Sequence, residues 1–249
     1  MLKSLNPSYK TGHDRNFWIW KSYEPGKKYF LIADVARGDG KDFSAFHVFD
    51  SETMEQVAEY QGKANIDMYS QIIYDASKEY GFCLTVVENN SIGLAALNKL
   101  SDMEHPNIFY SVKSTNMHVD QFEAQNISNS IAGVTISAKN RPLIIAKLEE
   151  FIRNKLIKVN STRLANEFKT FIWNNGRAEA MRGYNDDLVM SCAIACWVRE
   201  MEYRRALVGA ISTNGKIFNA TIPGQKGYKE NKLQAKKKDY EKFSWLFKG

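Results

Sequence analysis

The sequence predicts a mixed α/β fold, in which antiparallel strands come first and parallel strands with flanking helices follow. Three runs rich in apolar residues lie close together along the chain, at 29–36, 43–50 and 54–61. Two further apolar runs, 82–88 and 107–112, each follow a segment with helical periodicity. Strands joined through a helix must lie parallel to a neighbour, so this order predicts a mixed sheet of three antiparallel strands plus parallel ones.

The polar residues 1–16 predict a flexible lead-in. The apolar run 17–20 predicts an edge strand or a packing anchor. The connection 51–53 is short, so the strands on either side of it should form a hairpin and extend a three-stranded meander. Apolar residues at helical spacing over 66–80 predict a helix that ends at Gly81.

The continuous apolar run 82–88 predicts a strand covered on both faces. A helix over 91–100 and a fifth strand over 107–112 should follow. Residues 113–140 are polar and irregular, and a loop of that length is usually functional or mobile.

The second half of the chain predicts mainly helices. We expect helices over 141–158 and 162–171, and then a hairpin that turns at Asn175-Gly176. A long apolar helix should open at the acidic pair Asp186-Asp187. The Lys-rich residues 212–249 predict a basic tail behind a single domain at 17–211, and this tail is either mobile or ends in a short amphipathic helix.

Composition bounds the function only loosely. The 249 residues are 44% hydrophobic and 25% charged, as in ordinary globular proteins. The net charge of +6 favours a polyanionic partner, but weakly. The three cysteines lack a zinc-type CxxC spacing and predict buried reduced thiols. The start lacks the apolar region of a signal peptide, and no apolar run reaches the roughly 18 residues of a membrane helix, so we expect no membrane partner.

Carboxylates recur at the ends of predicted strands. Asp34 ends the first strand, Glu88 ends the fourth, and Asp186 and Asp187 open the last core helix. If the fourth strand lies parallel beside the first, their carboxyl ends meet where α/β sheets place their sites. Clustered carboxylates need cations, and hard oxygen ligands suit Mg²⁺ or Mn²⁺, two of which would support phosphodiester hydrolysis.

Each acid also has a structural interpretation. An aspartate at a helix start is often an N-cap, and one member of the pair can cap while the other binds metal. Glu88 alone is compatible with a solvated strand end. Asp34 is harder to explain structurally, because a Gly-rich polar turn follows it directly. Spacing alone leaves the metal site and the structural roles equally open.

Three motifs in order carry a family resemblance. ADVARGDGKDFSAF at 33–46, VVENNSIG at 86–93 and GYNDDLVMS at 183–191 resemble the nuclease domain of the large terminase subunit of T4-like tailed bacteriophages. The intervening segments 141–155 and 171–181 resemble that family too. The resemblance covers about residues 17–200 and implies an RNase H/integrase-like fold.

The resemblance implies a metal-dependent endonuclease that cuts concatemeric double-stranded DNA with two Mg²⁺ or Mn²⁺ ions. Asp34, Glu88 and the Asp186-Asp187 pair would be its catalytic, metal-binding acids, and the resemblance leaves open which aspartate of the pair binds directly. Asp42 matches an acidic position that supports a second ion, although it also fits a solvated hairpin residue.

Large terminases also carry an N-terminal ATPase with a P-loop. No GxxxxGK[ST] motif occurs in this sequence, so we expect the ATPase domain to be a separate partner. The resemblance further implies the portal or procapsid and the small terminase subunit as partners, and the cytoplasm of the infected bacterial host as the location.

Duplex DNA binding needs Lys and Arg side chains that face phosphates. Basic residues cluster between 139 and 163, and many of them would suit a solvated helix face equally well. The candidates for DNA contact are Lys139, Arg141, Lys147 and, three residues after Asp34, Arg37. Two other functions stay open: another RNase H-like nuclease such as a junction resolvase, and a non-catalytic module that grips DNA or docks on the portal.

Overall fold

A computed structural model describes residues 6–12, 15–38, 42–90, 92–112, 130–174 and 176–202. The chain divides into two units, Met1–Trp197 and Val198–Gly249, and the fold below is that of the first. The predicted tail at 212–249 and most of the predicted irregular segment lie outside the described residues.

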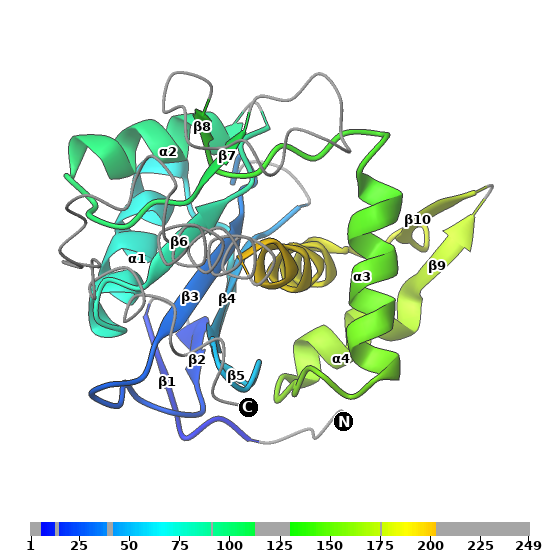
Figure 1. The fold of residues 1–249 in the computed structure, drawn as a ribbon, viewed down its shortest axis with the longest axis horizontal. Coiled ribbons are helices and arrows are strands. Elements are labelled where there is room, and N and C mark those ends of the chain that lie inside the picture. Colours follow the sequence, from blue (N-terminus) through cyan, green and yellow to red (C-terminus); the bar gives the residue numbers. More distant parts are fainter. Residues whose placement is uncertain are drawn as a thin grey trace, which may run out of the picture. The chain divides into compact units, whose positions relative to one another are not determined.

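Six strands form a mixed sheet in the order β1-β2-β5-β4-β3-β6 (Figure 1). The strands are β1 (Tyr9–Thr11), β2 (Phe17–Ile19), β3 (Tyr29–Asp34), β4 (Ser44–Asp50), β5 (Gln56–Gly62) and β6 (Leu84–Val87). β3, β4 and β5 form the predicted antiparallel meander. β6 lies parallel beside β3, which confirms the mixed sheet.

Strand β1 lies inside the segment that we expected to be a flexible lead-in. It pairs antiparallel with β2, which in turn pairs with β5. All three residues of β1 are exposed, so apolar patterning could not reveal this strand.

Helices α1 (Ile66–Glu79) and α2 (Ile92–Asp102) cover one face of the sheet (Figure 1). Tyr69, Ile73 and Leu97 from these helices belong to the same buried cluster as Leu31 and Ala33 of β3, alongside further core residues. Alternate residues of a strand point to opposite faces, so the intervening strand residues face the other layer. The helix that begins at Asp187 covers that opposite face with the residues that belong to this unit, up to Trp197.

The predicted fifth strand is only partly correct. Residues near Ile108 join the main sheet through a single parallel bridge to Thr85. The strand proper, β7 (Tyr110–Val112), pairs antiparallel with β8 (Ser130–Ala132) in a separate two-stranded sheet. The error arose because β8 lies in the segment that the sequence predicted to be irregular.

The elements after β8 are α3 (Arg141–Arg153), α4 (Thr162–Thr170), β9 (Phe171–Asn174) and β10 (Arg177–Ala180). β9 and β10 form the predicted hairpin. Helix α3 ends earlier than residue 158, because Lys155 has a positive φ of 57° and the chain then turns to bridge Glu55 through Lys158.

The three cysteines are free and buried, as predicted. Among the helices that the structure describes, none has both the length and the apolar character needed to cross a membrane.

Candidate active site

Asp34 and Glu88 meet at one end of the main sheet. Ala33 of β3 stands opposite Val87 of β6 in the parallel register, so each acid is the next residue along its own strand. The Glu88 amide donates to the Ala33 carbonyl oxygen at 3.0 Å, which holds the two strand ends together. The C-terminal ends of β3 and β6 therefore meet in the structure, as predicted.

The Asp34 carboxyl group lies in a field of other acids. Burial is the largest cause that raises its pKa well above the ordinary value. The negative charges of Glu88, Asp187 and Asp186 raise this pKa further, in that order. Asp34 therefore ionises less readily than an ordinary aspartate unless a cation compensates the neighbouring charges.

Glu88 has a mixed environment. Burial raises its pKa, and the charge of Asp186 adds to this, while Arg141 and hydrogen bonds with Asp34 and Asn90 act in the opposite direction. Asn90 donates from Nδ2 to Glu88 Oε1 and to the carbonyl oxygen of Ile136. Metal binding to carboxyl groups with raised pKa values releases the protons that they hold, because only the ionised form binds the metal.

Asp186 and Asp187 have different partners, although they are adjacent. Asp186 Oδ2 accepts from Arg141 Nη2 at 2.7 Å. Asp187 Oδ2 accepts from the Phe43 amide and from Asn185 Nδ2, each at 3.1 Å. Burial raises the pKa of Asp187, and Asp186 and Asp42 raise it further. Arg141 thus compensates Asp186, whereas Asp187 faces neutral donors.

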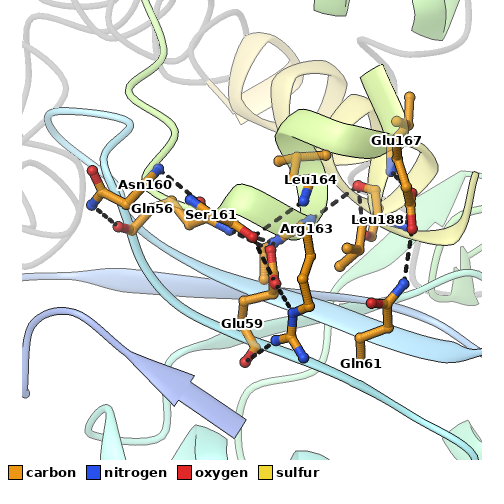
Figure 2. Close-up of polar contacts among 12 residues, drawn as sticks. Gln56, Glu59, Gln61, Asn160, Ser161, Arg163, Leu164, Glu167 and Leu188 are labelled. Atoms are coloured by element: carbon orange, nitrogen blue, oxygen red, sulfur yellow. Dashed lines mark hydrogen bonds and ion pairs between the residues drawn. The ribbon is translucent and has the colours of Figure 1, made fainter. Parts of the chain in front are cut away.

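Neither aspartate caps the helix with its side chain in these contacts. The Asp186 carbonyl accepts the Met190 amide, which makes Asp186 the N-cap residue by backbone geometry. Glu167 of α4, which lies beside Leu188 in Figure 2, binds the first-turn amides instead. Its Oε2 accepts from the Leu188 amide at 2.9 Å and from the Val189 amide at 3.1 Å. The N-cap interpretation of the acidic pair therefore does not account for either carboxylate.

Sequence reasoning missed Glu167. Its carboxylate comes from a helix that is separate in sequence from every motif, and nothing in its local sequence distinguishes it from a residue on a solvated face. Burial and the charge of Asp187 raise its pKa to about 8. Its second oxygen, Oε1, accepts from Gln61 Nε2 of β5 at 2.8 Å.

The polar turn after β3 places two further candidates. Asp42 is exposed, and it is near enough to Asp187 to raise the pKa of that residue. Arg37 is exposed on the same turn, and Lys139 is exposed just before α3.

Other basic candidates are engaged within the protein. Arg141 donates to the Ala178 carbonyl oxygen as well as to Asp186. Lys147 pairs with Glu150 at 2.6 Å, and its side chain is only 14% exposed. Lys158 and Arg163, from the same stretch, pair with the buried acids Glu55 and Glu59. These contacts therefore do not form a continuous phosphate-binding face over 139–163.

The donor set suits a hard divalent cation. Asp34, Glu88 and Asp187 supply carboxylate oxygens, which Mg²⁺ and Mn²⁺ prefer. Burial raises the pKa of all three, neighbouring negative charges add to each shift, and a bound cation would favour the ionised carboxylates. Within the described residues, no three Asp, Glu, His or Cys side chains are already arranged around a common metal position.

No protein-family model matches the chain. Among solved structures, it is similar to the large terminase nuclease of thermophilic phage G20c with bound magnesium. That match has a TM-score of 0.58 and 18% identity, and it covers 78% of this chain and 91% of that chain. The cobalt-bound form of the same nuclease matches with the same TM-score and identity.

The large terminase nuclease domain of Thermus phage P74-26 matches with a TM-score of 0.54 and 18% identity, over 77% of this chain and 88% of that chain. At these identities the likeness concerns the fold. The chain therefore has the RNase H-like fold that these terminase nucleases share.

Proposed function

We propose that this chain is the metal-dependent endonuclease domain of a bacteriophage large terminase subunit, of the T4-like group that its three motifs resemble. Its substrate would be concatemeric double-stranded DNA. The observation that carries the proposal is the meeting of Asp34 and Glu88 at adjacent parallel strand ends, with Asp187 near enough to raise the pKa of Asp34. The fold shared with terminase nucleases supports the same conclusion.

Asp34, Glu88 and Asp187 would hold two Mg²⁺ or Mn²⁺ ions, with Asp186 and Asp42 nearby. The magnesium and cobalt in the similar G20c nuclease structures support a divalent cation. Bound ions of this kind activate water and stabilise the leaving oxygen in phosphodiester hydrolysis.

The surrounding residues of this chain would orient these acids. Asn90 holds Glu88, the Phe43 amide and Asn185 hold Asp187, and Arg141 holds Asp186. Each of these contacts restricts a carboxylate rotamer, and hydrogen bonds of this kind to the ligand side chains tune a metal site.

DNA would reach the acids past the exposed side chains of Arg37 and Lys139. As a terminase nuclease, the chain would act in the host cytoplasm together with an ATPase domain, the small terminase subunit and the portal of the procapsid. The Lys-rich residues 212–249 are a candidate segment for docking on such partners.

The test is cleavage of plasmid and linear duplex DNA by the whole chain in Mg²⁺, in Mn²⁺ and in EDTA. Asp34→Asn serves as the inactive variant, and a four-way junction serves as a second substrate. We expect cleavage that needs the metal and falls by about 100-fold or more in Asp34→Asn, since the variant loses a ligand carboxylate.

Equal DNA binding by both proteins without cleavage would support a DNA-gripping module instead. Cleavage of the junction alone would support a resolvase. Either result would contradict the proposed terminase nuclease.

A further inference from the structure

We infer that Glu167 is a positioning residue of this site: it fixes the first turn of the helix that presents Asp187 to Asp34 and Glu88. The inference rests on the proposed function, because it concerns the same metal-binding acids. Glu167 belongs to α4, outside the three motifs that supply those acids.

The two hydrogen bonds of Glu167 Oε2 act directly beside Asp187. The Leu188 amide nitrogen is bonded to the carbonyl carbon of Asp187, and the peptide unit between them is planar. An acceptor 2.9 Å from that nitrogen therefore limits where the Asp187 backbone can lie. The second hydrogen bond, 3.1 Å long and donated by the Val189 amide, prevents the helix start from rotating about the first hydrogen bond.

A helix start needs such an acceptor, because its first amides have no partner within the helix. The N-cap side chain usually supplies it. Here the carboxylate of the N-cap residue, Asp186, is paired with Arg141, and that of Asp187 accepts from Phe43 and Asn185. Because Glu167 does the capping, the carboxylates of the acidic pair are available for other contacts.

Buried side chains also hold the first turn of this helix, through the carbonyl group of Leu188. His47 Nε2 lies 2.9 Å from the Leu188 carbonyl oxygen, and Gln56 Nε2 lies 2.8 Å from His47 Nδ1. Since the carbonyl must accept, Nε2 carries the proton and Nδ1 accepts from Gln56. The first turn is therefore fixed through an amide and through a carbonyl.

Glu167 is itself held by a polar network behind the helix (Figure 2). Gln61 of β5 donates to Glu167 Oε1 at 2.8 Å. On the same strand, the buried Glu59 accepts from Ser161 and Arg163, the residues at the start of α4. This network anchors α4 to the sheet, so that the carboxylate of Glu167 has a defined position relative to β3 and β6.

Three substitutions at one position separate geometry from charge. Glu167→Gln keeps the length and an acceptor oxygen but loses the charge. Glu167→Asp keeps the charge but is one methylene too short to reach the amides. Glu167→Ala loses both. Because the inference is geometric, we expect Gln to preserve the site while Asp and Ala do not.

The measurements are the affinity for Mn²⁺ by titration calorimetry and hydrogen exchange of the Leu188 and Val189 amides, both on the whole chain without DNA. We expect Asp and Ala at position 167 to weaken Mn²⁺ binding by about 10- to 100-fold, with Gln within about threefold of the wild type. Exchange of the two amides should accelerate in the same two variants.

Glu55→Gln is the matched control. Glu55 is a buried acid that, like Glu167, has several partners, but it precedes β5 at the end of the sheet away from Asp34. It should lower the melting temperature without changing the Mn²⁺ affinity. If Glu167→Ala does not fold, the Asp and Gln pair still decides.

The outcomes separate this inference from the proposed function. Equal Mn²⁺ affinity in the wild type and in Glu167→Asp would overturn the positioning role alone. Loss of affinity in Gln but not in Asp would show that Glu167 acts through its charge, and would also overturn it. A wild-type chain that binds no Mn²⁺ would overturn the metal site, and the inference with it.

Discussion

Neighbouring charges distinguish the two aspartates that begin the last core helix. Asp186 is paired with the Arg141 guanidinium at 2.7 Å, so its charge is compensated within the protein. Asp187 accepts only from neutral N–H groups in the contacts described, and it raises the pKa of Asp34 more than Asp186 does. Asp187 is therefore the aspartate of the pair whose negative charge a bound cation would stabilise more.

This difference predicts unequal effects of removing the two charges. Asp187→Asn should lower Mn²⁺ affinity and metal-dependent cleavage by about 100-fold or more, because a ligand carboxylate is lost. Asp186→Asn should cost roughly fivefold, equivalent to the loss of a partly exposed ion pair of about 1 kcal/mol. Titration calorimetry and plasmid cleavage on both variants check the ranking, and the reverse order would contradict it.

Individual site residues were predictable only where the pattern of strands in the sequence places them at a common edge of the sheet. Asp34 and Glu88 end apolar runs, and a parallel pairing of those runs brings them together. Glu167 had no such signal, because its role depends on α4 packing near the start of a helix that begins 20 residues later. The engagement of Lys147 with Glu150 was equally invisible, since charge alone does not tell a partly buried, ion-paired lysine from a solvated one.

At the scale of elements, α2 packs tightly against the end of β6. A side-chain carbon at Gly93 would overlap the carbonyl oxygen of Glu88, the residue whose side chain belongs to the site. The Gly93 amide also donates to the Asn90 carbonyl oxygen at 2.8 Å. The helix can start this close to the strand end only because position 93 has no side chain.

Gly93→Ala should therefore lower both stability and metal affinity. Alanine favours a helix by about 1 kcal/mol over glycine, but overpacking of this kind costs about 1 to 3 kcal/mol and must displace Glu88. We expect a net loss of about 1 kcal/mol in urea unfolding, with weaker Mn²⁺ binding in the folded variant. Leu94→Ala, at a 48% exposed position on the same helix, is the control and should be nearly neutral. A more stable Gly93→Ala protein would contradict the close approach.

The elements that the sequence predicted best are those with buried, periodic faces. β3 to β6 and α1 have continuous or alternating apolar residues, and each appeared within a few residues of its expected place. β1 and β8 were missed because β1 is fully exposed and β8 is only half-buried, so neither has the pattern of a core strand. Tertiary contacts then set the end of α3, where the chain leaves the helix to bridge Glu55.

At the scale of the whole molecule, the site makes the metal-free protein sensitive to pH. The pKa values of Asp34, Glu88 and Asp187 are all raised, with burial as the largest cause, and that of Glu167 is raised to about 8. A carboxyl group whose pKa is higher in the folded state binds more protons folded than unfolded. Its contribution to the free energy of unfolding is therefore full below the unfolded pKa and is lost as pH rises through the folded pKa.

The buried histidines act in the opposite direction and limit the window. Burial lowers the pKa of His47 and of His105 below the ordinary 6.5. A group of this kind opposes folding while the unfolded histidine is still protonated, so its effect fades as pH rises through 6.5 and is nearly gone about one pH unit higher. Above that pH the histidines contribute little, and the raised carboxyl groups dominate the pH dependence.

We therefore expect the melting temperature in EDTA to fall as pH rises from about 7.5 to 9, because Glu167, with a pKa of about 8, loses its native proton there and the pKa values of the other acids are raised too. Saturating Mg²⁺ should remove most of the decline, because a cation compensates the same charges without protons and stabilises the state that binds it.

In EDTA, Asp34→Asn should be more stable than the wild type by about 1 kcal/mol near pH 8, as expected when a site that sacrifices stability for function is neutralised. Thermal unfolding of both proteins across this range, with and without Mg²⁺, measures all three effects. A wild-type profile that is flat in EDTA would show that these acids do not repel one another in the folded protein. A slope that Mg²⁺ leaves unchanged would show that no cation binds between them.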